Sequence, residues 1–246
     1  MSESWPEEVP TVKQAVSWLS QHRYDKYLSL ASGKHALAME IYAWNSELSS
    51  AILRDLAHVE VAVRNALDAE LAPNFPEWAA TATPGWLQLQ NGTPRARRTQ
   101  QNLNNEGLKV LHKAQRDIGA GATHGMVLAR LSFGFWQFLV TPRVRESTLW
   151  TPYLHNAFPR GTARTEVSKF MESAVSLRNR LAHLEPVASS STSVVDRLAD
   201  INRLFQLVAP EIHKWIASRS DVEDIIGREP VPGLILAKSA EKRISP

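Results

Sequence analysis

The chain has 246 residues, a formal net charge of +3 at pH 7 and no cysteine. Its 43% of hydrophobic and 22% of charged residues are typical of a globular protein with a substantial core. The absence of cysteine excludes disulfides, thiolate metal sites and a cysteine nucleophile, and it fits the reducing cytoplasm in which we expect the protein. No apolar run reaches the roughly 18 residues of a membrane span, and the acidic stretch 1–10 lacks the apolar core of a secretory signal, so we expect no membrane partner.

Apolar residues recur at helical spacing along most of the chain, and no segment alternates as a strand would. The pattern predicts a short amphipathic helix over 12–22 and a very long helix over 34–71, which Pro73 and Pro76 end. The long helix contains neither proline nor internal glycine, although a bend or break near Asn45 would be compatible with its length. These features predict an all-α fold with one dominant helix.

After an irregular connection over 72–95, the pattern predicts further helices at 97–117, 126–140, 164–183, 194–208 and 210–217. Ser193 is the expected N-cap of the helix over 194–208, because serine at that position can accept hydrogen bonds from the first free N–H groups. The expected organisation is a helical lead-in, one helical domain and a flexible tail, over 1–33, 34–230 and 231–246.

Three residues near the end of the helix predicted over 164–183 carry the most informative chemistry: Arg178, Asn179 and His183. We call them the Arg-Asn-His motif. Asn179 and His183 are four residues apart and share one helical face, and Pro186 predicts that the helix ends near His183. The motif offers a cation for a phosphate, an imidazole for proton transfer and an amide that can orient either group, which are the groups needed to cleave RNA without a metal. The simpler interpretation is that these residues only cap the helix and contact local carbonyls or Glu185.

Six basic residues also gather in one region, and we call them the basic cluster: Arg95, Arg97, Arg98, Lys109, Lys113 and Arg116. Because the net charge is small, an RNA-binding surface must come from such local clustering. We therefore predict that the basic cluster binds RNA, together with Arg180 inside the motif. A solvated loop and helix face is the other interpretation, and the lack of interleaved aromatic residues argues against base stacking there.

A second Arg-Asn pair, Arg64-Asn65, lies in the long helix, but Ala69 occupies the position of the histidine. Glu60 precedes Arg64 by four residues, so a helix-surface ion pair is the simpler interpretation. No two histidines have the spacing of metal ligands, and neither a phosphate-binding glycine loop nor a nucleophile elbow occurs. We predict no metal and no cofactor, and nothing supports nucleotide hydrolysis or acyl transfer.

The stretch Arg178–Pro186 (Arg-Asn-Arg-Leu-Ala-His-Leu-Glu-Pro) resembles the signature of HEPN domains, in the form typical of the Abi-like (abortive infection) branch. Other stretches agree with that branch in the family's order: Tyr42–Asn45, Leu56–Asn65, Leu131–Trp136, Leu149–Trp150 and Ala157–Pro159. The resemblance runs from about Lys34 to Pro230. It implies an all-helical HEPN-type bundle with additional peripheral helices, homodimers whose motifs face each other and, in many members, metal-independent RNase activity in phage defence or toxin–antitoxin systems.

On this resemblance, the Arg-Asn-His motif is catalytic, RNA is the substrate, and an antitoxin or another defence-system partner is a further expectation. In the family, an acidic residue on the long helix can contact the active arginine or histidine. We therefore expect Glu60 to orient the motif, with Arg64 and Glu185 as further supporting residues. Because other HEPN proteins are inactive, the alternative is a non-catalytic module that binds a partner or acts as a sensor. A third interpretation is a site that binds a nucleotide or receives a modification.

Overall fold

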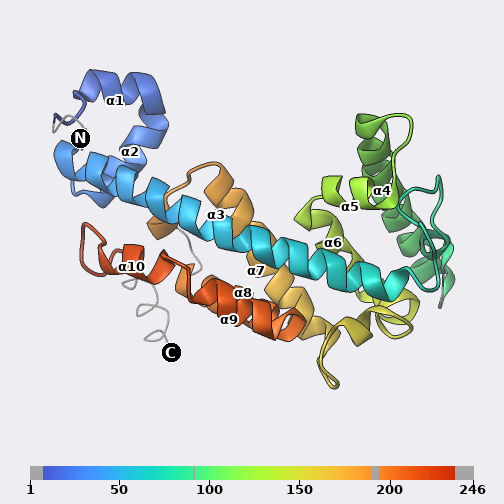
Figure 1. The fold of residues 1–246 in the computed structure, drawn as a ribbon. Coiled ribbons are helices and arrows are strands. Elements are labelled where there is room, and N and C mark those ends of the chain that lie inside the picture. Colours follow the sequence, from blue (N-terminus) through green and yellow to red (C-terminus); the bar gives the residue numbers. More distant parts are fainter. Residues whose placement is uncertain (1–7, 91, 190–193, 236–246) are drawn as a thin grey trace. The chain divides into compact units, whose positions relative to one another are not determined.

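The computed structural model describes residues 8–90, 92–189 and 194–235, and every regular element in these ranges is a helix (Figure 1). The predicted all-α class is therefore confirmed. The chain divides into two compact units. Unit 1 comprises Met1–Asp55, Arg178–Asp196 and Arg219–Pro246, and unit 2 comprises Leu56–Leu177 and Arg197–Ser218. The boundaries expected at residues 34 and 230 both fall inside unit 1.

Unit 1 begins with α1 (Val12–Leu19) and α2 (Gln21–Leu30), where the sequence pattern predicted one helix over 12–22. That prediction was wrong because Ser20, with a φ of 71°, ends the first helix and redirects the chain into the second. Both helices pack against the first turns of α3 (His35–Leu71) around one apolar cluster, which contains Ala15, Leu19, Tyr24, Tyr27, Ala31, Ala38, Met39, Ile41 and Tyr42.

The long helix α3 is confirmed, and it runs for 37 residues without a break at Asn45. Its buried positions follow the helical repeat that predicted it, and they include Ile41, Leu48, Ile52, Leu56, Val59, Val63 and Leu67. It contributes residues 35–55 to unit 1 and residues 56–71 to unit 2. None of the helices in the described ranges is long and apolar enough to cross a membrane.

The last helix of unit 1 is α10 (Val222–Gly227), which the sequence pattern did not predict. The indole of Trp44 in α3 donates a hydrogen bond to the carbonyl of Ile225 at 2.8 Å and so fastens α10 to the long helix. Residues 231–235 form turns, and Val231 and Leu234 pack on the apolar cluster of unit 1. The beginning of the segment expected to be a flexible tail is thus packed, while residues 236–246 lie outside the described ranges.

The α-helices assigned wholly or partly to unit 2, besides α3, are α4 (Pro94–Ile118), α5 (His124–Arg130), α6 (Phe133–Val140), α7 (Arg164–Ala182), α8 (Val194–Val208) and α9 (Pro210–Ala217). Short 3-10 turns occur at Gly85–Gln88, Arg143–Arg145, Leu154–Ala157 and, in unit 1, Val187–Ser189, with a π-helical turn at Glu146–Trp150. The bounds of α8 and α9 agree with the sequence prediction, and Ser193 lies outside the described residues.

Two predicted helices in unit 2 need correction. Helix α4 begins three residues earlier than expected, at Pro94, because the Thr93 side chain accepts a hydrogen bond from the backbone of Ala96. The single helix predicted over 126–140 is in fact two helices, α5 and α6, separated at Leu131 and Ser132. Helix α6 contributes Phe135 and Trp136 to the buried aromatic core of unit 2, where their rings contact those of Trp78 and Trp86.

Candidate functional site

The Arg-Asn-His motif lies in unit 1, at the C-terminal end of α7. Arg178 and Asn179 lie four and three residues before Ala182, the last residue of the helix, and His183 is the first residue beyond it. All three side chains are exposed. Arg178 donates to the Asn179 amide oxygen at 3.3 Å, whereas the His183 imidazole has no hydrogen-bond partner in the described part of the chain. A cation, an amide and an imidazole are therefore open to a ligand from solvent.

The helix that carries the motif ends in a tight, hydrogen-bonded turn. The N–H of Leu184 donates to the carbonyl of Leu181 at 2.9 Å, and the N–H of Glu185 donates to the carbonyl of Arg180 at 3.2 Å. These two bonds define a Schellman ending, with Leu184 in the left-handed conformation at a φ of 49°. A leucine in that conformation costs about 1–2 kcal/mol, so neighbouring contacts must hold it in place.

Helix α2 supplies two of these contacts. The guanidinium of Arg23 donates to the carbonyl oxygen of His183 at 2.9 Å, and the phenol of Tyr27 donates to the carbonyl oxygen of Leu184 at 3.1 Å. Both acceptors lie just beyond Ala182, where no further helical turn follows to supply N–H donors. Burial raises the pKa of the Tyr27 phenol, which therefore stays protonated and remains a donor. The backbone that bears the imidazole is thus fixed from α2.

Helix α3 supplies a third contact through Asn45, which is only 1% exposed. Its amide nitrogen donates to the Tyr27 hydroxyl at 3.0 Å, and its amide oxygen accepts a hydrogen bond from the backbone N–H of Val187 at 2.8 Å. The residue lies on the apolar stripe of α3, between Ile41 and Leu48, where a polar side chain is unusual and needs partners. An asparagine among the apolar positions of a predicted helix is the sequence signal that could have identified Asn45.

Arg180 and Glu185 contact the same turn. Arg180 donates to the carbonyl of Pro186 at 3.2 Å, and its guanidinium lies 3.7 Å from the carboxylate of Glu185. Both residues are partly buried and stabilise the chain as it leaves α7. The expected contact of Arg180 with RNA and the expected support of the motif by Glu185 stay predictions.

Glu60 and Arg64 belong to the part of α3 that lies in unit 2, whereas the motif belongs to unit 1. Arg64 donates to the amide oxygen of Asn65 at 3.1 Å, so the second Arg-Asn pair shows the same local bond as the first. The expected orienting role of Glu60, with Arg64 beside it, stays a prediction.

The basic cluster lies on α4, in unit 2, and all six of its side chains are exposed. Three of them are engaged locally. Lys109 pairs with Glu106 at 2.7 Å, Lys113 pairs with Asp117 at 2.5 Å, and Arg97 donates to the carbonyl of Gly92 at 3.0 Å. The other cluster members form no ion pair within 4 Å among the described residues, and they are Arg95, Arg98 and Arg116. RNA binding by the cluster stays a prediction, with three cations available for it.

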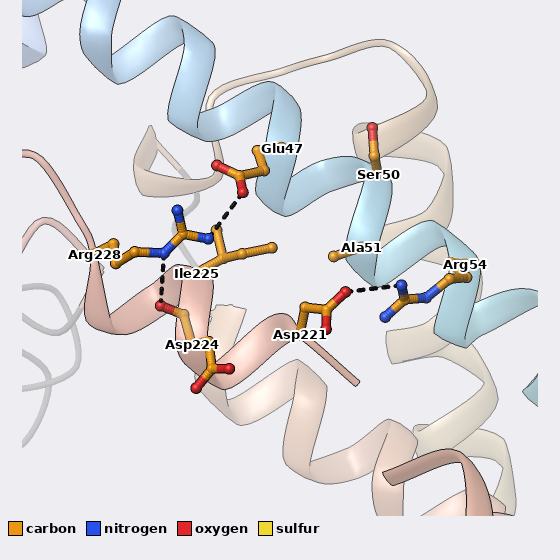
Figure 2. A pocket seen from close by; sticks show the side chains of 8 residues that line it. All are labelled: Glu47, Ser50, Ala51, Arg54, Asp221, Asp224, Ile225 and Arg228. Carbon is orange, nitrogen blue, oxygen red and sulfur yellow. Dashed lines mark hydrogen bonds and ion pairs between the residues drawn. The ribbon is translucent and has the colours of Figure 1, made fainter. Parts of the chain in front are cut away.

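A shallow groove of about 430 Å³ lies between α3 and α10, within unit 1 (Figure 2). Two ion pairs connect its walls. Glu47 pairs with Arg228 at 2.9 Å, and Arg54 pairs with Asp221 at 2.9 Å. The hydrogen bond to Asp221 raises the pKa of the Arg54 guanidinium, which is the usual effect of an opposite charge. These pairs fasten α10 to α3, and we assign the groove a structural role.

Across residues 8–90, 92–189 and 194–235, no group of three or more histidine, aspartate or glutamate side chains is arranged to hold a metal ion. No protein-family model, curated protein or solved structure matches the chain. The functional assignment therefore depends on the chemistry of the Arg-Asn-His motif and on the contacts that hold it.

Proposed function

We propose that the protein is a metal-independent endoribonuclease of the HEPN type, with its site on Arg178, Asn179 and His183. The supporting observation is that these three exposed side chains project from one helix end, whose backbone is fixed by Arg23, Tyr27 and Asn45. A catalytic site requires functional groups that a substrate can reach and a backbone that holds them in a fixed geometry.

In the proposed reaction, the 2′-hydroxyl of a ribose attacks its own adjacent phosphorus. The new bond joins phosphorus to the 2′-oxygen, the bond to the 5′-oxygen breaks, and the products carry a 2′,3′-cyclic phosphate and a 5′-hydroxyl. His183 moves a proton, Arg178 neutralises the charge of the pentacoordinate transition state, and Asn179 orients the imidazole or a phosphate oxygen.

One motif supplies a single imidazole, whereas the reaction needs a base for the 2′-hydroxyl and an acid for the leaving 5′-oxygen. Two copies of the chain related by a two-fold axis would supply both groups, so the proposal includes a homodimer with facing motifs. The resemblance to Abi-like proteins supports a cytoplasmic role in phage defence or as a toxin, with RNA as the substrate and an antitoxin or another defence protein as a partner.

The direct test is cleavage of RNA in EDTA by the parent protein, by His183→Ala and by a matched control, His58→Ala, which alters another exposed histidine. We expect His183→Ala to lose about 10²- to 10⁴-fold in cleavage rate, because a proton-transfer group is removed. Its unfolding midpoint should not change, since the His183 side chain is exposed and has no described partner.

Cleavage by His183→Ala at the rate of the His58→Ala control would show that the mechanism is wrong. A parent protein that dimerises but leaves every RNA intact in EDTA would instead support the non-catalytic interpretation, in which the motif serves partner binding. In that case, sedimentation of Arg178→Ala would reveal whether the motif contributes to the dimer.

A further inference from the structure

We infer that Arg23 is a second phosphate-binding guanidinium of the site, so that its RNA-binding surface extends from the end of α7 onto α2. This inference deepens the proposed function and rests on it. The sequence pattern did not indicate Arg23, because α2 itself was not predicted and because a bond to a backbone carbonyl has no sequence signature.

The first argument is location. Nη2 of Arg23 lies 2.9 Å from the carbonyl oxygen of His183, the residue that carries the imidazole. The Schellman ending and the Tyr27 bond to Leu184 fix this carbonyl, so the guanidinium of Arg23 is held beside the motif. Arg23, on α2, therefore contacts the backbone of the imidazole-bearing residue from a second element, whereas Arg178 belongs to α7 itself.

The second argument is availability. A guanidinium has five N–H donors, and the bond to His183 uses one of them. Within the described ranges, no carboxylate pairs with Arg23, and its side chain is only partly buried. Arg180 differs in this respect, because it is engaged with Pro186 and Glu185. Arg23 thus keeps an uncompensated charge and unused donors next to His183.

The third argument is chemical. A phosphodiester carries a full negative charge, and its non-bridging oxygens gain more in the transition state. A guanidinium binds two phosphate oxygens at once through its planar donors, which suits it to this task better than an ammonium group. Two guanidinium groups at this helix end, Arg178 on α7 and Arg23 on α2, would bind the scissile phosphate or the phosphate next to it.

The test is the affinity for RNA whose 2′-hydroxyls are methylated, which binds but cannot react, measured in EDTA over a range of salt concentrations. We expect Arg23→Met to weaken binding about tenfold. The variant should also reduce the slope of log affinity against log salt by about one, since one phosphate contact is lost. Arg23→Lys, which keeps the charge, should keep the slope of the parent.

Two variants control for other causes. Tyr27→Phe removes the bonds of the Tyr27 hydroxyl to Leu184 and to Asn45 and changes no charge, so it reports on the fixation of the turn. Lys13→Met removes an exposed cation of α1 and reports on the net charge. The inference predicts the parental slope for both. It is wrong if Arg23→Met keeps the parental slope, or if Lys13→Met lowers the slope equally.

These results are separable from those of the proposed function. If the parent cleaves natural RNA and Arg23→Met binds methylated RNA as the parent does, only the inference fails. If the parent binds methylated RNA through Arg23 but cleaves no natural RNA, only the proposed function fails. A parent protein that does not bind RNA at all would overturn both.

Discussion

A single buried amide, that of Asn45, connects three segments of unit 1, one of which is 142 residues away along the chain. It lies in α3, donates to Tyr27 in α2, and accepts from Val187 beyond the motif. Pro186 was sufficient to predict where α7 ends. The contacts that fix this end could not be predicted, because they join side chains to backbone groups about 140 to 160 residues away along the chain.

We expect Asn45→Ala to lower the free energy of unfolding by about 1–3 kcal/mol, because it leaves the buried N–H of Val187 without its acceptor. Urea unfolding measures this change. The variant should also cleave RNA more slowly than its folded fraction explains, since the turn that carries His183 loses an anchor. Asn65→Ala, at an exposed position of α3, is the control. Equal unfolding midpoints for the two variants would contradict the anchoring role.

At the scale of the helices, prediction from sequence was most accurate where apolar residues recur over many turns or a proline marks a boundary. Helix α3 has the first property, and α9 begins at Pro210. Prediction failed at Ser20 and at Leu131–Ser132, where helices end without a proline or glycine at the junction. Ser20 and Ser132 are the N-caps of α2 and α6, and serine is a common residue at that position, but neither side chain makes a capping hydrogen bond.

Helix packing in unit 2 depends on a residue that the sequence pattern did not indicate. Arg164, the first residue of α7, is only 7% exposed. It donates to the carbonyls of Val140 and Thr141, at the end of α6, at 2.9 and 2.7 Å, and it pairs with Glu146 at 2.5 Å. One guanidinium thus caps the C-terminus of α6 and joins it to the start of α7.

We expect Arg164→Met to lower the free energy of unfolding by about 2–4 kcal/mol, because two carbonyl groups lose a charged donor and the methionine offers none. Chemical denaturation of this variant and of Arg160→Met, which alters an exposed arginine nearby in the chain, measures the difference. If both variants unfold at the parental denaturant concentration, the capping role of Arg164 is wrong.

At the scale of the whole molecule, the division into two units was not predictable from composition. Three of the four boundaries fall inside helices, α3, α7 and α8, so no linker rich in proline, glycine or charge marks them. Unit 1 assembles its site from α2, α3 and the end of α7, which come from separate parts of the sequence. The motif residues were found from their local pattern, whereas this assembly required the fold.

The proposed dimer is also a property of the whole molecule, since each copy of the chain brings one Arg-Asn-His motif. The chemistry requires two proton-transfer groups at one phosphate, and the exposure of His183 leaves it accessible to a second copy. In this account, a protomer binds RNA through Arg178 and Arg23, and the dimer completes the acid and base pair.

The most direct measurement of the central claim is mass spectrometry of the products that the parent protein forms from a defined RNA in EDTA. The account predicts fragments with a 2′,3′-cyclic phosphate or its hydrolysis product at one end and a 5′-hydroxyl at the other, which His183→Ala does not form. Fragments with a 5′-phosphate, or the same products from His183→Ala at the parental rate, would contradict it.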